Sequence, residues 1–176
     1  NLNWFYSGLR SYASSYFSKE DMDIILPVID SNQSDSACLD NVVEILAHTG
    51  RSLPHVMMML VPEAWDGNEQ MDPLKKAFYE FHATLMEPWD GPAALTFTDG
   101  SQIGALLDRN GLRPLRYAMT NDKRIIVASE AGALPIPESI IIKKGRLQPG
   151  KMFLVDLKEG KIITDQEIKH KIASGQ

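Results

Sequence analysis

The chain has 176 residues, 44% hydrophobic and 23% charged, a composition typical of a globular protein long enough to bury a core. A net charge of -5 gives no general attraction to nucleic acid or anionic membranes, and no apolar run is long enough to cross a bilayer. The only cysteine, Cys38, has no partner for an internal disulfide, which favours a reducing cytoplasm. We therefore expect a cytoplasmic chain with no nucleic-acid or membrane partner. No linker or repeat divides it, so residues 1–176 are expected to form one domain.

Three helices are indicated in the first half of the chain. Residues 1–30 are mixed, and the polar segment SNQSDS follows them. Ser36 is a plausible N-cap for a helix that runs to Gly50, and a second helix starts near Pro54 and ends before Pro62. The third helix is the best marked, with Asp72 as its cap and Pro73 in its first turn. Its predicted apolar face consists of Leu74, Ala77, Phe78, Phe81 and Leu85.

From Pro92 onward the pattern changes to short strands and turns. AALTFT and QIGALLD flank Asp99-Gly100, and LLD and LRPLRYAM flank Asn110-Gly111, so a hairpin is predicted at each dipeptide. Further strands are RIIVASE, SIIIKKG, MFLVDL and KIIT, and a last helix follows Thr164. Helices followed by hairpin-linked strands predict an α+β fold with two layers of antiparallel sheet covered by helices.

The polar segment before the first of these helices has two interpretations. Asp35 or Ser36 could cap the helix, a role worth roughly 1 kcal/mol. Alternatively, the Asp35 carboxylate could hold an ammonium group of a ligand through charge-assisted hydrogen bonds. From the residues alone, the cap is favoured.

The remaining reactive residues do not form a catalytic set. Cys38 has no histidine near it in the sequence and is expected to be structural. The four histidines lack the spacing of a zinc site, so no metal is expected. The charged residues Asp108, Arg109 and Arg113 flank the Asn110-Gly111 turn, either as surface charges or as a polar network near a site.

Several long blocks carry a family resemblance. They are SDSACLDNV, VPEAW, AFYEFHATLMEPWDGPA, LLDRNGLRPLRY and KKGRLQPGKMFLVD, together with the opening NLNW. In order and spacing they resemble the glutamine amidotransferase domain of the glutamate synthase large (alpha) subunit, a class II amidotransferase. The resemblance covers essentially the whole chain.

The resemblance implies an N-terminal-nucleophile hydrolase fold, a four-layer αββα sandwich, of which residues 1–176 would be the C-terminal part, incomplete at the N-terminus. It implies hydrolysis of L-glutamine to glutamate and ammonia, with the ammonia channelled to amination of 2-oxoglutarate elsewhere in the polypeptide. The parent enzyme would use FMN, an iron–sulfur cluster, and NAD(P)H or ferredoxin. None of these cofactors is expected in this chain, whose partners would be L-glutamine and the remaining domains of the large subunit.

The site residues carry over only in part. Asp35 matches the carboxylate that binds the α-amino group of glutamine, so Asp35 and Ser34 are expected to bind substrate. The N-terminal nucleophilic cysteine is absent, because residue 1 is Asn, and the oxyanion Asn-Gly pair would precede NLNW. Asp108, Arg109 and Arg113 are expected to form a supporting network near the site. The chain alone is therefore expected to be inactive on glutamine.

Two other hypotheses remain open. The chain could be a non-catalytic amino-acid-binding or structural module with the same fold. It could also be an amidotransferase domain of another synthase, although the VPEAW and EPWDGPA blocks weigh against this.

Overall fold

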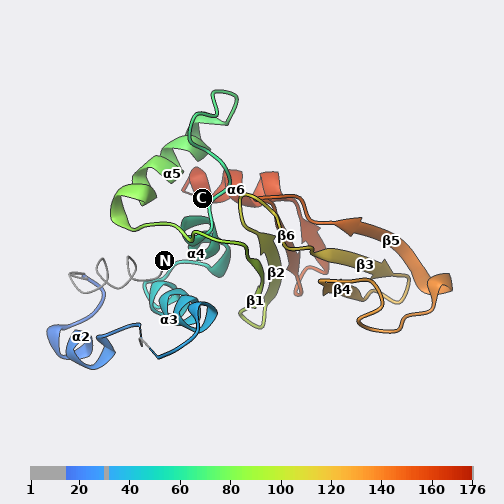
Figure 1. The fold of residues 1–176 in the computed structure, drawn as a ribbon, viewed down its shortest axis with the longest axis horizontal. Coiled ribbons are helices and arrows are strands. Elements are labelled where there is room, and N and C mark those ends of the chain that lie inside the picture. Colours follow the sequence, from blue (N-terminus) through green and yellow to red (C-terminus); the bar gives the residue numbers. More distant parts are fainter. Residues whose placement is uncertain (1–14, 30–31, 176) are drawn as a thin grey trace.

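The computed structural model describes residues 15–29 and 32–175 (Figure 1). In chain order, the described elements are α2 (Lys19–Ile25), α3 (Asp35–Ala47), α4 (Leu53–Leu60), α5 (Pro73–Leu85), β1 (Ala94–Thr98), β2 (Gln102–Leu107), β3 (Arg116–Thr120), β4 (Ile125–Ala128), η1 (Glu138–Ile140), β5 (Ile141–Arg146), β6 (Met152–Asp156), β7 (Lys161–Ile163) and α6 (Asp165–Ala173).

The helix boundaries follow local capping chemistry. Asp72 accepts hydrogen bonds from the backbone amides of Leu74 and Lys75, which confirms the predicted start of α5. Thr164 and Glu167 form a reciprocal capping box at the start of α6. Helix α2 was not predicted, although Ser18 begins it with the same type of box. The signal was there in the residue types, but only seven residues follow it.

The predicted apolar face of α5 is confirmed only at Phe78 and is wrong at its other four positions. Leu74, Phe81 and Leu85 are exposed, and the buried residues of the helix are Phe78, Tyr79 and His82. Helix α5 packs against α6 and α4. Tyr79 and His82 bury their rings there and satisfy their polar atoms, the hydroxyl with Glu63 and Nδ1 with the carbonyl of Phe78.

All strand pairs are antiparallel, as predicted. One sheet has the order β1-β2-β6-β7, and the other has the order β4-β3-β5. The Asp99-Gly100 turn joins β1 to β2 as expected. The hairpin predicted at Asn110-Gly111 is wrong, because β2 belongs to the first sheet and β3 to the second. Residues 108–115 are therefore a crossing between two sheets.

Alternation along the strands places the first sheet between two apolar layers. Leu106 and Leu154 face the helices, while Leu107 and Phe153 face the second sheet. Tyr117 of β3 stacks on Phe153, with ring centroids 4.9 Å apart. Figure 1 shows α3, α4 and α5 on one side of the first sheet and β3, β4 and β5 on the other.

The fold is thus α+β, with the helix–sheet–sheet order of a layered sandwich. A second helical layer is not among the described residues, so the four-layer arrangement stays a prediction. The outer side of the second sheet instead bounds a hollow of about 820 Å³, which the segment 130–138 helps to line.

Candidate functional site

The SDS segment lies at the N-terminus of α3. Ser34 is the N-cap, and its Oγ accepts a hydrogen bond of 3.3 Å from the amide of Ala37. The capping role considered for Asp35 or Ser36 is therefore wrong. Asp35 is the first helical residue and is exposed. Among the described residues, its carboxylate has no recorded hydrogen bond or ion pair. The carboxylate lies in the positive field of a helix N-terminus.

A side chain further along α3 holds the segment that leads into this end of the helix. Nδ2 of Asn41 donates to the carbonyl of Val28 at 2.9 Å and to Oε1 of Gln33 at 3.3 Å. These bonds connect the helix to two residues that precede Ser34 in the chain. The apolar residues Cys38, Leu39, Val42 and Leu46 anchor the buried face of α3 in the core.

Asp108 is a buried hydrogen-bond acceptor at the end of β2. Its Oδ1 accepts from the amide of Ala93 at 3.0 Å, and Oδ2 accepts from the amides of Asn110 at 2.9 Å and Gly111 at 3.2 Å. The side chain therefore closes the turn that begins the crossing and fixes it to the segment before β1. Asp108 is 3% exposed, so replacing its side chain would leave the buried amide of Ala93 without this acceptor, whereas the amide of Gly111 would keep the carbonyl of Asp108 at 3.1 Å.

The two arginines of the crossing are exposed and reach the same neighbouring segment. Arg109 pairs with Asp90 at 3.3 Å, and Nε of Arg113 donates to the carbonyl of Pro92 at 3.2 Å. Asp108, Arg109 and Arg113 thus all contact residues 90–93. No hydrogen bond or ion pair within the described ranges joins them to Ser34 or Asp35.

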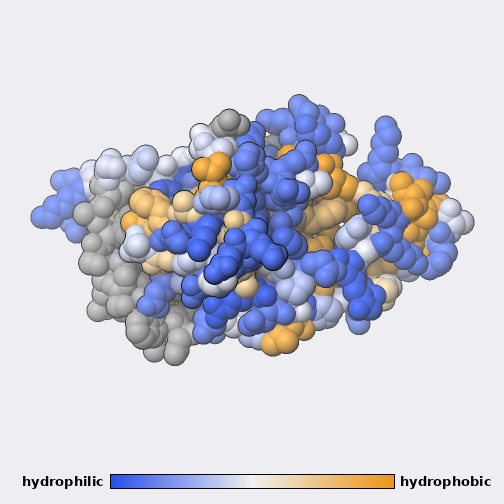
Figure 2. Space-filling view, turned by 90° about the horizontal axis from the view of Figure 1, so that it is seen from above, coloured by the Kyte–Doolittle hydropathy of each residue, from blue (hydrophilic) through white to orange (hydrophobic). Residues whose placement is uncertain are grey.

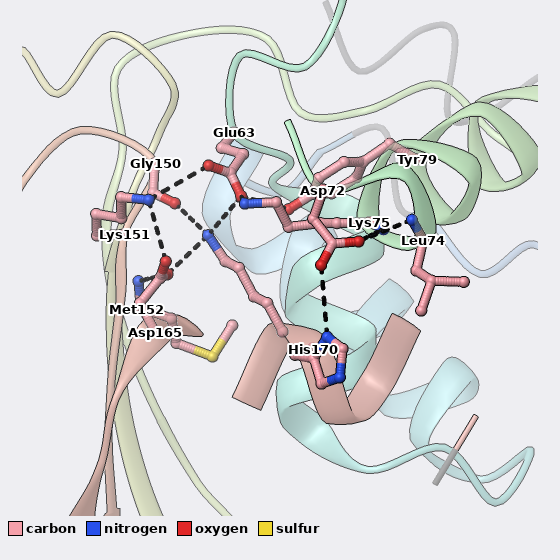
Figure 3. Close-up of polar contacts among 11 residues, drawn as sticks. Glu63, Asp72, Leu74, Lys75, Tyr79, Gly150, Lys151, Met152, Asp165 and His170 are labelled. Atoms are coloured by element: carbon pink, nitrogen blue, oxygen red, sulfur yellow. Dashed lines mark hydrogen bonds and ion pairs between the residues drawn. The ribbon is translucent and has the colours of Figure 1, made fainter. Parts of the chain in front are cut away.

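A second polar cluster surrounds Glu63, in the loop after α4 (Figure 3). Its carboxylate lies 2.9 Å from Nζ of Lys75 and 3.2 Å from Nζ of Lys169, and Lys151 lies at 3.4 Å. Asp165 completes the cluster at 2.7 Å from Lys169 and 3.1 Å from Lys151. The cluster brings together the loop after α4, helices α5 and α6, and the turn before β6.

The charges in this cluster compensate one another. Burial raises the pKa of Glu63, but attraction by Lys169, Lys75 and Lys151 outweighs it and lowers this pKa to about 2. Burial, reinforced by the Glu63 charge, raises the pKa of Tyr79, whose hydroxyl donates to Glu63 at 3.2 Å. Glu63 therefore stays ionised and Tyr79 neutral over the physiological pH range.

Gly150 connects the Glu63 cluster to Asp108. Its amide donates to the carbonyl of Asp108 at 2.9 Å, and its own carbonyl accepts from Lys169 at 2.6 Å. Its φ is +67°, and a Cβ atom there would lie 2.7 Å from Cβ of Glu63. Only glycine meets both requirements without strain.

The Glu63 cluster was not predicted from the sequence, because its members come from segments that are far apart in the chain. A signal existed in α6, where Lys169 lies beside the apolar residue Ile168 and both are buried. Glu63 itself lies within the VPEAW block.

The other reactive groups are enclosed by the core. Cys38 is 3% exposed. Burial, with the charges of His82 and Arg51, lowers the pKa of His55 to about 4, and no described group hydrogen-bonds its buried Nε2. His82 lies beside it, with ring centroids 5.5 Å apart. Within residues 15–29 and 32–175, no group of three or more potential ligands could hold a metal ion. The helices of this part of the chain are too short or too polar to span a membrane.

Comparisons with known proteins agree over the full chain. The family model of the class II glutamine amidotransferases matches residues 1–176. The glutamate synthase [NADPH] large chain of Bacillus subtilis is 50% identical over 174 residues, covering 99% of this chain and 11% of that protein. The glutamate synthase [NADH] of Schizosaccharomyces pombe is 50% identical over 175 residues, covering 99% of this chain and 8% of that protein.

The name of a third relative specifies a different electron donor, ferredoxin. The ferredoxin-dependent glutamate synthase 2 of Synechocystis is 43% identical over 175 residues, covering 98% of this chain and 11% of that protein. The chain therefore spans about a tenth of the length of these relatives. Because the family model matches the chain over residues 1–176, the chain belongs to the class II glutamine amidotransferases.

Proposed function

We propose that this chain is part of the glutaminase domain of a glutamate synthase-type polypeptide. The reaction is hydrolysis of L-glutamine by water to glutamate and ammonia. The family membership and the relatives named glutamate synthase support this assignment. The chain's own contribution is substrate binding, through the N-terminal end of α3.

The observation that carries the proposal is the state of Asp35. Its neighbour Ser34 caps the helix, so the Asp35 carboxylate is not required for capping. An exposed carboxylate that no other described residue engages can bind the α-ammonium group of an amino acid through charge-assisted hydrogen bonds. We assign this role to Asp35. Ser34 lies at the same end of the helix, where it fixes the backbone that presents Asp35 and faces the substrate.

The nucleophile is assigned to a part of the polypeptide outside residues 1–176. Cys38 is unsuited to the role because its side chain is packed in the core. The ammonia produced would aminate 2-oxoglutarate in another part of the polypeptide, where FMN and an iron–sulfur cluster would reside. The relatives' names include NADPH, NADH and ferredoxin, so any of these donors is compatible with the proposal.

The test is Asp35→Asn in the natural full-length polypeptide. Loss of a hydrogen bond between charged groups costs about 1.5–3 kcal/mol, so the KM for glutamine should rise roughly tenfold to a hundredfold. The melting temperature should fall by no more than about 4 °C, because Ser34 still caps α3 and loss of the Asp35 charge at the helix N-terminus costs about 0.3–1 kcal/mol. Asp40→Asn is the matched control, since Asp40 is an exposed carboxylate of the same helix.

Three outcomes distinguish the hypotheses. An unchanged KM together with a lower melting temperature would assign Asp35 a structural role. Glutamine binding without turnover in the wild-type full-length polypeptide would favour the non-catalytic module. A raised KM in Asp35→Asn alone supports the proposal.

A further inference from the structure

One side chain of α3, that of Asn41, joins the helix to residues that precede its N-cap. Asn41 follows Ser34 by seven residues, which is close to two full turns, so both residues lie on the same side of the helix. Side chains of an α-helix lean toward its N-terminus. The Asn41 amide therefore reaches back toward the segment before Ser34, where its Nδ2 donates to the carbonyl of Val28 at 2.9 Å and to Oε1 of Gln33 at 3.3 Å.

The two acceptors of Asn41 have different surroundings. Val28 is buried and belongs to the hydrophobic core, so its carbonyl is a fixed point. Gln33 is exposed and comes directly before Ser34 in the chain. The amide nitrogen of an asparagine carries two hydrogens and can make both bonds at once. One half-buried side chain thus connects the core to the residue before the N-cap.

The contacts within the first turn of α3 are longer. The bond from the amide of Ala37 to Oγ of Ser34 measures 3.3 Å, and the hydroxyls of Ser34 and Ser36 also lie 3.3 Å apart. Usual lengths are about 2.9 Å for N–H···O bonds and about 2.8 Å for O–H···O bonds. The bond from Asn41 to Val28 has the usual length. It is therefore the strongest of these restraints on the start of the helix.

The position of the Asp35 carboxylate matters because a charge alone does not distinguish a site on this protein. Hydrophilic residues cover most of the face that Figure 2 shows, and hydrophobic residues lie there in separate patches. A small ligand is selected by a few precisely placed polar groups. A charge-assisted N–H···O bond requires a separation of about 2.7–2.9 Å, so a small displacement of the carboxylate weakens it.

We propose that Asn41 is a positioning residue for glutamine binding. Its two hydrogen bonds fix the start of α3 relative to the core, and they thereby hold the Asp35 carboxylate where it binds the α-ammonium group. Asn41 acts through Asp35 and makes no contact with glutamine. The inference rests on the proposed function, because it requires Asp35 to be the group that binds the substrate.

The experiment measures KM and kcat for glutamine in the natural full-length polypeptide. Asn41→Leu keeps roughly the size of the side chain and removes both donors. The KM should rise about twofold to tenfold, the factor that corresponds to loss of a neutral hydrogen bond, and kcat should stay unchanged. Asn41→Gln keeps an amide on a longer side chain and should raise KM less. Glu44→Leu, at an exposed position of the same helix, is the matched control and should leave KM at the wild-type value.

A double variant tests whether Asn41 acts through Asp35. If Asn41 only positions the carboxylate, adding Asn41→Leu to Asp35→Asn should raise KM no further than Asp35→Asn alone. Gln33→Leu removes only the 3.3 Å bond, and it does so at an exposed residue. It should raise KM by a smaller factor than Asn41→Leu, and it provides the test if Asn41→Leu does not fold.

Two results would overturn the inference. A normal KM together with a lower melting temperature in Asn41→Leu would give Asn41 a structural role only. Multiplied effects on KM in the double variant would show that Asn41 acts independently of Asp35. Failure of the proposed function gives a different result, since KM would then be unchanged in Asp35→Asn itself. If Asp35→Asn raises KM and the Asn41 variants do not, only the positioning role is lost.

Discussion

Removal of the Glu63 charge should destabilise the fold strongly. In Glu63→Gln, Lys169 keeps only Asp165 and the carbonyl of Gly150 as partners, and its side chain is 4% exposed. The cluster then contains three lysines and one carboxylate. Breaking one side of a buried ion pair costs roughly 3–5 kcal/mol, because the remaining charge has lost both water and its partner.

The pKa of Glu63 gives an independent magnitude. A decrease from 4.5 to about 2 corresponds to roughly 3 kcal/mol of interaction at neutral pH. Partial access of solvent screens the charges and reduces this to about 2 kcal/mol. The two arguments together predict a loss of about 2–4 kcal/mol, equivalent to a decrease of roughly 5–15 °C in melting temperature for a chain of this size.

The pH dependence checks that the charge is responsible. The folded-state pKa of Glu63 lies below the unfolded value, so its stabilisation is complete above pH 4.5 and is lost as pH falls through about 2. The difference between wild type and Glu63→Gln, measured by urea unfolding, should therefore be largest near pH 7 and shrink below pH 4.5. Glu69→Gln, at an exposed carboxylate, is the control. A loss below about 1 kcal/mol, or a difference that does not change with pH, would refute the reasoning.

Three further predictions concern buried groups. Asp108→Ala should lower the free energy of unfolding by about 2–4 kcal/mol, since three amides lose an acceptor, whereas exposed Arg113→Ala should cost about 1 kcal/mol; equal losses in urea unfolding would contradict this. Unfolded His55 takes up a proton near pH 6.5, and folded His55 does so only near pH 4. As pH falls from 6.5 to 4, the free energy of unfolding should therefore decrease by at most about 1.4 kcal/mol per pH unit. His55→Leu should reduce that slope, and an unchanged slope would exclude His55 as its source. Cys38→Ser should lower the melting temperature without lowering kcat for glutamine in the full-length polypeptide, and a lost kcat at normal stability would assign Cys38 to the chemistry.

Local signals in the sequence were sufficient at several element ends, although the capping box at Ser18 was missed and the cap of α3 proved to be Ser34. Asp72 caps α5 and Thr164 caps α6 through amides two or three residues away. The Asp99-Gly100 turn joins strands that are adjacent in the chain and paired in space. Each of these features is determined within a few residues, so the printed sequence contained the necessary information.

Three other errors have their origin in packing against residues that are distant in the chain. Asn110-Gly111 has the residue types of a hairpin turn, yet Leu107 packs between the sheets and the chain continues into the second sheet. The apolar residues of α5 predicted which face would be buried. Tyr79 and His82 are buried instead, because that side of the helix packs against α4 and α6 and their polar atoms have hydrogen-bond partners there. Lys169 can be buried because it pairs with Glu63. This partner lies 106 residues earlier in the chain, so the sequence around Lys169 does not reveal it.

Four of the sequence blocks that carry the family resemblance meet around Gly150, which lies in the KKGRLQPGKMFLVD block. Its amide binds Asp108 of the DRNGLRP block, and Asp108 in turn binds Ala93 of the EPWDGPA block. Its carbonyl binds Lys169, which pairs with Glu63 of the VPEAW block. The two alternatives for the charged residues of this segment, surface charges or a polar network, therefore apply to different residues. Asp108 joins a buried network, whereas the arginines fasten it from the surface.

This arrangement separates the blocks that meet around Gly150 from the residues proposed to contact glutamine. The junction at Gly150 joins both the crossing between the sheets and the loop after α4, so it determines how the helices sit on the first sheet. Asp35 depends on that packing through α3, whose buried face includes Leu39 and Val42. A defect at Glu63 or Asp108 should therefore lower stability first, and affect glutamine binding only through partial unfolding. A defect at Asp35 should do the reverse.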